Sequence, residues 1–219
     1  MRKGPTVHVL SSPVADTDIR IRTATSADGD TIVELASLVD LHVPSEAVPA
    51  ALAPMRFALT ATDDGPLSHR ENHFLIAEDR EGRPVGAIVC GPPNWIAKPG
   101  RAPGLVRRRL VHRLSTVHAL AVRPDHRGRG IGRTLLQQAE KTFHEAGYAA
   151  LTLRHERELT RFYERLGYTS SSRLSLALPT GELLTLVDRG WKHAFKVLSS
   201  SVSTTTVQGL PTLTGVLSD

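Results

Sequence analysis

The sequence lacks the residues that would support a disulfide framework, a cysteine metal cluster or a membrane-spanning helix. Its 219 residues include one cysteine, Cys90, which excludes an intramolecular disulfide and a cluster of cysteine ligands. No apolar run approaches the roughly 18 residues that a membrane span requires. The basic residues after Met1 are not followed by the apolar segment of a signal peptide. We therefore expect a cytoplasmic protein that binds no metal and no membrane.

Acidic residues are scarce in one part of the chain, where arginine is abundant. Between Arg101 and Arg133 lie nine arginines and a single acidic residue, Asp125, so this stretch has a net charge of about +8 in a chain of net charge +5. A local basic patch favours an anionic ligand, either nucleic acid or a multiply phosphorylated cofactor. A solvated basic face is the alternative interpretation.

Hydrophobic periodicity predicts one domain of mixed helices and strands. Strands are expected at residues 19–24, 73–77, 85–90, 116–122 and 150–153, with a C-terminal hairpin of 173–178 and 182–187. Helices are expected at about 26–41, 50–59, 131–146 and 159–166.

The two ends of the chain differ in composition from the part between them. We expect residues 1–17 to form a flexible lead-in and residues 18–198 to form the folded domain. Ten of the residues 199–219 are Ser or Thr, and only Asp219 is charged there. This composition predicts a poorly ordered tail.

A glycine-rich turn joins the strand at 116–122 to the helix at 131–146. It reads Arg127-Gly128-Arg129-Gly130-Ile131-Gly132. The free N–H groups and dipole of a helix N-terminus attract phosphate, and glycine lets the backbone approach it closely. The lysine of a P-loop is missing, and the glycine spacing is not that of a dinucleotide-binding turn. The turn therefore predicts a phosphorylated ligand of another kind.

Two segments together resemble the GNAT superfamily of acyl-CoA-dependent N-acetyltransferases. Leu120-Ala-Val-Arg-Pro-Asp-His-Arg-Gly-Arg-Gly-Ile-Gly-Arg-Thr-Leu-Leu136 is similar to the acyl-CoA signature [R/Q]-x-x-G-x-[G/A], matched at Arg127, Gly130 and Gly132. Arg161-Phe-Tyr-Glu-Arg-Leu-Gly-Tyr168 is similar to the segment F-Y-E-K-L-G-F. The resemblance covers roughly residues 18–190. It implies the GNAT fold, of the α+β class: a central, mostly antiparallel, splayed sheet of six to seven strands flanked by about four helices.

The resemblance also implies which residues bind acetyl-CoA as the acyl donor. The pyrophosphate would lie on the backbone amides of the turn, with Arg133; the residues concerned are Arg127, Gly128, Arg129, Gly130, Ile131 and Gly132. Backbone groups around Leu120, Ala121 and Val122 would pair with the pantetheine arm as a strand does. That arm would enter where the strands at 116–122 and 150–153 splay apart. Glu156 stands where family members often have an asparagine that contacts the cofactor.

The implied reaction is direct attack of a primary amine, from a small molecule or a peptide, on the acyl thioester. An amine with a pKa of roughly 10.4 is protonated at pH 7, so the site must remove a proton. The thiol that leaves has a pKa of about 8.5, so a nearby proton donor helps. Tyr163 matches the family tyrosine near the CoA sulfur and is expected to be this general acid. The N–H of Val122 would polarise the thioester carbonyl.

His118 is the first candidate for the general base. It lies on the strand before the glycine turn, and a neutral imidazole suits proton removal near pH 7. A structural or solvent-facing histidine is the alternative, and His112, Glu156 or a chain of water molecules could accept the proton instead.

The sequence says less about the residues that would bind the acceptor amine than about those that would bind acetyl-CoA. Trp95 and Trp191 could line an acceptor pocket or pack in the core, and the arginines at 107–109 could reach the CoA 3′-phosphate, an acidic acceptor or solvent. In this family the region corresponding to 43–72 usually shapes the acceptor pocket. The sequence does not identify the amine.

Two other functions remain open on the same fold. One is a module that senses acyl-CoA without turnover, and the other is a transferase acting on an RNA-linked substrate such as an aminoacyl-tRNA. The presence of Tyr163 favours an enzyme over a sensor. Nucleic acid is not the expected partner, because aromatic residues do not interleave the basic stretch. A homodimer is left open.

Overall fold

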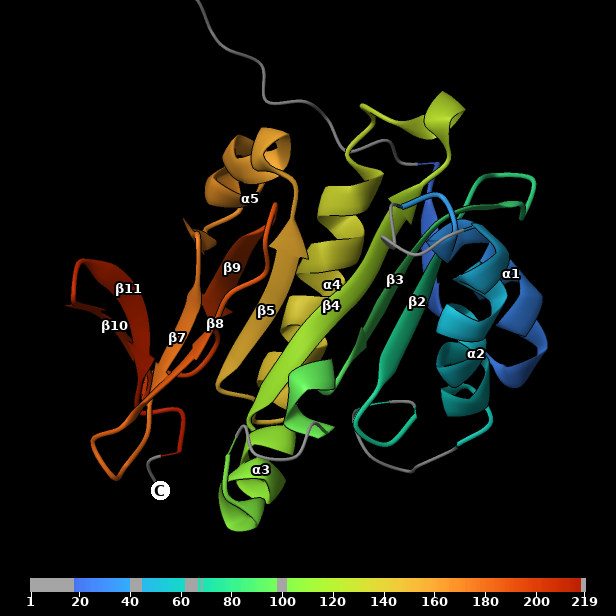
Figure 1. Ribbon diagram of the computed structural model, residues 1–219. Coiled ribbons are helices and arrows are strands. Elements are labelled where there is room, and N and C mark those ends of the chain that lie inside the picture. The colour runs from blue at the N-terminus through green and yellow to red at the C-terminus, as the bar shows by residue number, and fades with distance from the viewer. Residues whose placement is uncertain (1–17, 40–44, 62–66, 68, 98–101, 218–219) are drawn as a thin grey trace, which may run out of the picture.

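The computed structural model describes residues 18–39, 45–61, 67, 69–97 and 102–217 (Figure 1). The expected lead-in at 1–17 lies outside these residues. So do residues 40–41 at the end of the first expected helix, and 43–44, 62–66 and 68 in the region expected to shape the acceptor pocket.

A seven-stranded central sheet forms the frame of the described residues. Its strand order is β1-β2-β3-β4-β5-β9-β6, and every neighbouring pair is antiparallel except β4 and β5. The strands are β1 (Arg20–Thr23), β2 (His73–Glu78), β3 (Pro84–Gly91), β4 (Leu114–Val122), β5 (Ala150–His155), β9 (Lys192–Val197) and β6 (Thr169–Ser171). The α+β class and the mostly antiparallel sheet are therefore confirmed.

The two parallel strands of this sheet separate part-way along their length. β4 pairs with β5 only from Leu114 opposite Ala150 to Val117 opposite Leu153. Beyond Val117, β4 pairs with β3 alone, while β5 continues beside β9. Figure 1 shows the resulting divergence of β4 and β5 toward the upper end of the sheet. The splay expected between these strands is thus present.

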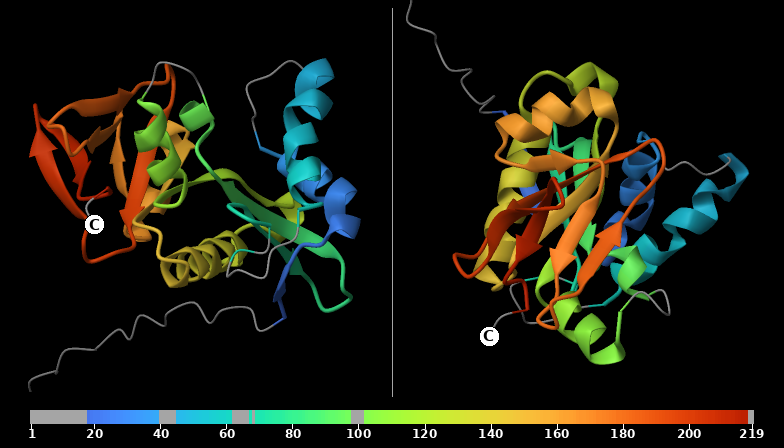
Figure 2. Two further views of the ribbon diagram at one scale, coloured as in Figure 1. Left: turned by 90° about the horizontal axis from the view of Figure 1, so that it is seen from below. Right: turned by 60° about the vertical axis from the view of Figure 1, so that its left-hand side comes forward.

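Helices cover the two faces of the sheet differently. α4 (Ile131–Glu145) packs on one face, where its buried Leu135 and Phe143 join a core with residues of β2, β3 and β5. α1 (Gly29–Ala36) and α2 (Val48–Ala58) cover the other face of β2, β3 and β4. The remaining helices are α3 (Gly104–Val111) and α5 (Thr160–Arg165), which makes five in the described part of the chain, where about four were expected. Figure 2 shows α1 and α2 on the side opposite α4.

A second sheet covers β5 and β9 on the face that α1 and α2 leave open. Its order is β10-β11-β7-β8, with β7 (Leu174–Ala177), β8 (Leu183–Leu186), β10 (Ser203–Val207) and β11 (Leu210–Thr214). Buried leucines from this sheet pack with Phe195 of β9 and Leu114 of β4 in a separate core. The expected hairpin of 173–178 and 182–187 is confirmed as β7 and β8, but it belongs to this second sheet.

The expectation of a poorly ordered tail at 199–219 is corrected by β10 and β11. The polar composition of this segment suggested disorder. Threonine is β-branched, however, and β-branched residues favour strands. Gln208 and Gly209 both have positive φ angles, 52° and 75°, which is the backbone of a tight two-residue hairpin turn. Leu213, Val216 and Leu217 are buried in the core of the second sheet. The last described residues are therefore part of the folded domain.

None of the helices among the described residues is long and apolar enough to cross a membrane.

Leu213→Ala tests whether the C-terminal hairpin stabilises the domain. Leu213 is fully buried, so truncating it removes apolar contacts and leaves a cavity, and we expect the free energy of unfolding to fall by about 2–5 kcal/mol. Urea unfolding followed by circular dichroism measures this change. Thr205→Ala, at an exposed position of β10, is the matched control and should change stability by about 1 kcal/mol or less. Equal stability of the two variants would contradict a folded C-terminal hairpin.

Candidate functional site

A cleft of about 420 Å³ opens where β4 and β5 diverge. Its floor is the splayed part of the sheet, and its walls come from α2 on one side and the second sheet on the other. The lining includes Leu52 and Met55 of α2, Thr116 to Leu120 of β4, Thr152 to Arg154 of β5, Glu156, Tyr163, Leu186, Asp188, Trp191 and His193. The separation of the strands, rather than a loop, therefore positions the site.

His118 occupies a β-bulge at the point where the strands separate. Ala119 is opposite Val89 while Val117 is opposite Cys90, so His118 is the extra residue on β4. Its Nε2 lies 3.2 Å from the carbonyl oxygen of Pro92. A carbonyl only accepts hydrogen bonds, so Nε2 carries the hydrogen and Nδ1 keeps the lone pair.

The environment of His118 keeps its imidazole neutral. Burial lowers the pKa of His118 to about 4, and the positive charge of Arg154 lowers it further, against the opposing effect of the hydrogen bond to Pro92. In the described part of the chain, Nδ1 has no hydrogen-bond partner. His118 lines the cleft with a neutral ring whose Nδ1 keeps its lone pair. The sequence identified this histidine as a candidate, but it did not predict the bulge.

The edge of β4 that faces β5 is open beyond Val117. Arg123 donates its backbone N–H to the carbonyl of Val85 on β3, so by the alternation of an antiparallel strand the N–H and C=O of Leu120 and Val122 point to the open edge. The side chain of Leu120 lines the cleft, whereas Ala121 packs under α1 and α2. A ligand in extended conformation can pair with this edge as a further strand does.

The glycine turn follows directly from this open edge. Gly128 and Gly130 have φ angles of 79° and 83°, and Gly130 is the N-cap residue of α4. A Cβ placed on either glycine would meet no atom within 4 Å, so the backbone there is accessible. Arg127 Nε donates to the carbonyl of Val122 at 3.0 Å and holds the turn against the end of β4.

The backbone amides of this turn are available to an external acceptor. Within the described residues, none of the amides from 128 to 133 donates to a backbone carbonyl, and the first such donor is Thr134. Arg129 and Arg133 are exposed beside them. Six free N–H groups, a helix N-terminus and exposed guanidinium groups suit a bound phosphate group.

Tyr163 lies in α5 with its side chain almost fully buried beside the cleft. It is 6% exposed and contacts the rings of His155, Phe162 and Tyr168 at centroid distances of 5.0, 5.0 and 5.8 Å. Tyr163 lines the cleft, and within the described residues its hydroxyl makes no hydrogen bond. Burial, and secondarily the charge of Glu156, raise the pKa of Tyr163 well above its ordinary value, so the hydroxyl stays protonated. This position in the ring cluster fits a packing residue, and it also fits a residue that donates a proton.

Glu156 directly follows β5 and also lines the cleft. It is half-buried, and it is the N-cap residue of the short 3-10 helix Arg157–Leu159 that leads into α5.

A polar cluster at the mouth of the cleft was not found from the sequence. Arg154, Asp188, Trp191 and His193 all line the cleft. Asp188 Oδ2 lies 3.3 Å from Nε2 of His193 and 3.6 Å from Nη1 of Arg154, whose guanidinium stands 5.4 Å from the ring of Trp191. These residues come from β5, β9 and the loop after β8, so their proximity depends on the pairing of β9 with β5.

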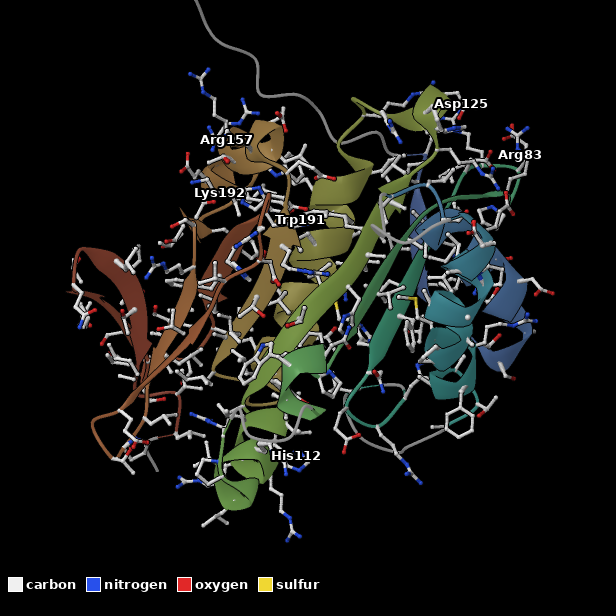
Figure 3. All side chains as sticks on the ribbon, in the orientation of Figure 1. Arg83, His112, Asp125, Arg157, Trp191 and Lys192 are labelled. Carbon is white, nitrogen blue, oxygen red and sulfur yellow. The ribbon has the colours of Figure 1, made fainter. Side chains whose placement is uncertain are left out.

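Several other sequence candidates lie away from the cleft. His112 is exposed at the end of α3, and Figure 3 shows it at the opposite end of the molecule from Asp125, which precedes the glycine turn. Nine residues of β4 separate these ends, roughly 30 Å. The arginines at 107–109 belong to α3, so they lie at the same end of the molecule as His112, far from the glycine turn. Arg109 instead donates to the carbonyl of Leu217 at 2.6 Å.

The remaining candidates divide between the cleft and the core. Trp95, like Trp191, lines the cleft. Cys90 is fully buried, and burial raises the pKa of its thiol well above the usual range, which makes it an unreactive core residue. His69 and His73 have the spacing H-x-x-x-H, but no group of three or more metal-ligating side chains is assembled among the described residues.

Comparison with known families gives a match for the part of the chain that holds this site. Residues 70–170 match the family described as acetyltransferase (GNAT) domain. An uncharacterized N-acetyltransferase of Methanocaldococcus jannaschii is 32% identical over 101 residues. That alignment covers 45% of this chain and 39% of the relative, so the matched part spans well under half of that protein.

Solved structures resemble the fold over most of the chain. A GNAT-family acetyltransferase of Staphylococcus aureus has a TM-score of 0.56 at 14% identity, covering 83% of this chain and 99% of that chain. The acetyltransferase YncA of Salmonella typhimurium, determined with acetyl-CoA, has a TM-score of 0.51 at 18% identity, covering 87% and 100%. The spermidine/spermine N-acetyltransferase SpeG of Vibrio cholerae has a TM-score of 0.52 at 16% identity, covering 85% and 96%. At these identities the likeness establishes the fold.

The ionisation of His118 can be measured directly. Because burial lowers its pKa to about 4 from 6.5, we expect the imidazole to remain neutral as the pH falls from 7 to 5. Between these two pKa values the unfolded chain binds the extra proton and the folded chain does not, so this histidine makes stability fall as the pH drops. Imidazole NMR shifts followed from pH 7.5 to 4.5, with His118→Ala to assign the resonance, show whether the ring titrates in this range. A midpoint near 6.5 would contradict the burial of this side chain.

Proposed function

We propose that this chain is an N-acetyltransferase of the GNAT superfamily. It moves an acetyl group from acetyl-CoA directly to a primary amine of a small molecule or peptide. The observation that carries this proposal is the continuity of three features along one path. The free amides of the glycine turn lead to the open edge of β4, and that edge leads to the cleft that Tyr163 and His118 line.

The chain's own groups fit an acyl-CoA along this path. The amides of 128–133, with Arg127, Arg129 and Arg133 around them, provide donors for a pyrophosphate. The N–H and C=O groups of Leu120 and Val122 suit the amides of the pantetheine arm, which need strand-like partners. The bound donor supplies the acyl group as a thioester, at the point where β4 and β5 part.

In the proposed reaction, Tyr163 acts as the general acid. When the amine nitrogen bonds to the acyl carbon, the carbon–sulfur bond breaks and the electron pair stays on sulfur. The raised pKa of Tyr163 keeps its hydroxyl protonated, and that hydroxyl has no competing acceptor among the described residues. Its proton, or a strong hydrogen bond from it, stabilises the sulfur as it leaves.

In the proposed reaction, His118 receives the proton that the amine gives up after it has bonded to the acyl carbon. Its Nδ1 carries a lone pair at pH 7 because the pKa of His118 is lowered to about 4. A base of this strength does not deprotonate a free ammonium of pKa roughly 10.4 efficiently, so the ammonium must lose one proton to water before its nitrogen attacks. Once the nitrogen has bonded to the acyl carbon its N–H is far more acidic, and the imidazole can then accept the proton.

Three observations favour an amine-modifying enzyme over the other functions possible on this fold. A free hydroxyl on Tyr163 inside the cleft has no purpose in a protein that only senses acyl-CoA. The basic stretch does not form one continuous surface for RNA, because Arg109 and Arg113 donate to carbonyls of Leu217 and Val216 at the end away from the turn. The named activity of the Vibrio cholerae neighbour toward spermidine and spermine supports an amine acceptor.

Thiol release from acetyl-CoA across a panel of primary amines tests this function. We expect release that depends on the amine, with the acetylated amine as the second product. Gly130→Val is the control, because a β-branched residue is strained at a φ of 83° and should distort the turn that binds the donor. Tight binding of coenzyme A by calorimetry with no turnover on any amine would instead support the sensor.

The variant Tyr163→Phe tests whether Tyr163 acts as a general acid or only packs against its neighbours. The substitution keeps the ring contacts with His155 and Phe162, and removes only the hydroxyl. We expect kcat to fall by roughly 10²–10⁴-fold, the usual range for general acid catalysis, while the Kd for coenzyme A changes less than about threefold. Steady-state kinetics and calorimetry measure the two effects. A kcat equal to that of the unmodified protein would leave Tyr163 a packing residue only.

A further inference from the structure

Arg154 projects into the acceptor side of the cleft immediately after the two strands part. It follows Leu153, the last residue of β5 that pairs with β4, and it lies opposite His193 on β9. It is a cleft-lining residue with a side chain that is 52% exposed. In Figure 3, Trp191 lies nearer the middle of the molecule, whereas Arg157 points outward beyond α5.

The guanidinium of Arg154 is supported but not hydrogen-bonded. Its central carbon stands 5.4 Å from the centroid of the Trp191 ring, an arrangement that restricts its position and leaves its N–H groups free. Asp188 Oδ2, at 3.6 Å from Nη1, lies beyond hydrogen-bond distance. Within the described residues, Arg154 therefore donates no hydrogen bond, although the guanidinium has five N–H donors.

The other ionisable groups around the cleft give Arg154 a distinct role. Glu156 and Asp188 contribute carboxyl groups. Burial lowers the pKa of both His118 and His193, so neither imidazole carries a charge at pH 7. Arginine keeps its charge at any accessible pH, which makes Arg154 the one permanent cation among the described residues that line the cleft.

We propose that Arg154 binds an anionic group of the acceptor, so that the acceptor is an amine that also carries a carboxylate. The guanidinium forms a bidentate pair with that carboxylate, and the acceptor's ammonium group enters on the side of Glu156 and Asp188 before it loses its proton. This inference rests on the proposed function and narrows its substrate class to amino acids and similar zwitterions.

Two features argue against simpler roles for Arg154. As an ion pair with Asp188 it would contribute little to stability, because both side chains are over 40% exposed and the contact is long. A polyamine carries positive charges alone, and it would meet the positive charge of Arg154 in the cleft lining. An amine with a carboxylate satisfies both signs of charge that the lining presents.

Matched pairs of acceptors test the inference. Glycine, β-alanine, 4-aminobutanoate and L-lysine are each compared with the corresponding carboxamide, and 1,4-diaminobutane is added as an acceptor without an acid. We expect kcat/KM for the best acid to exceed that for its amide by about tenfold or more in the unmodified protein. Arg154→Gln should bring this ratio to within about twofold of one by raising the KM of the acid, with the KM of acetyl-CoA unchanged.

Three further variants sharpen the result. Arg154→Lys keeps the charge without the planar fork, so it should retain part of the preference. Arg154→Glu should reverse it in favour of 1,4-diaminobutane. Arg157→Gln is the matched control, because this exposed arginine lies outside the cleft lining and should leave the ratio unchanged. Thermal melts confirm that each variant folds.

The results that would overturn this inference differ from those that would overturn the proposed function. An equal ratio in the unmodified protein and Arg154→Gln, or a native preference for amides or diamines, would overturn the role of Arg154 while leaving an acetyltransferase. Absence of turnover on every amine would overturn the function. Fluorescence of the two tryptophans, both of which line the cleft, still reports binding of each acid or amide in that case. Equal binding of both by the unmodified protein would then also reject Arg154 as the anion site.

Discussion

The end of the pairing between β4 and β5 is the constraint on which the rest of the site depends. Four residue pairs hold these strands together, and the bulge at His118 follows directly after the last of them. An unpaired strand edge inside a domain leaves N–H and C=O groups without partners, and buried groups of this kind destabilise a fold unless something satisfies them. The open edge is therefore stable only beside water or a ligand, and the fold keeps it at the floor of a cleft.

The second sheet determines how much of that cleft is enclosed. It packs on β5 and β9 through its own core, so its wall moves with β5 rather than with β4. The C-terminal segment packs into this core next to α3, and Arg109 and Arg113 donate hydrogen bonds to its carbonyls at Leu217 and Val216. The last described residues of the chain thus take part in fixing Leu186, Asp188 and Trp191 at the cleft, although they lie far from it in sequence.

The sequence predicts those features that a short segment encodes by itself. The glycine turn, the helix after it and the segment around Tyr163 are each local, and the structure has the expected helix as α4 and Tyr163 in the cleft lining. The bulge at His118 was not predictable, because it depends on the register of β4 against β3. Nor was the cluster of Arg154, Asp188 and His193, because β9 gives no sign in the sequence that it will insert between β5 and β6. The C-terminal hairpin was missed because threonine-rich composition was interpreted without its β-branching.

The two halves of the cleft differ in the kind of group that would do the binding, and this difference explains what the sequence can and cannot specify. On the donor side the groups are backbone amides and carbonyls, so the requirement on the sequence is for glycines and a helix start rather than particular side chains. On the acceptor side the groups are the side chains of Arg154, Glu156, Asp188 and the two tryptophans. A backbone site accepts many surrounding sequences, whereas a side-chain site changes its ligand with a single substitution. Under the proposed function, specificity for the amine would therefore reside in the wall that the second sheet supports and in Arg154, which β5 contributes beside it.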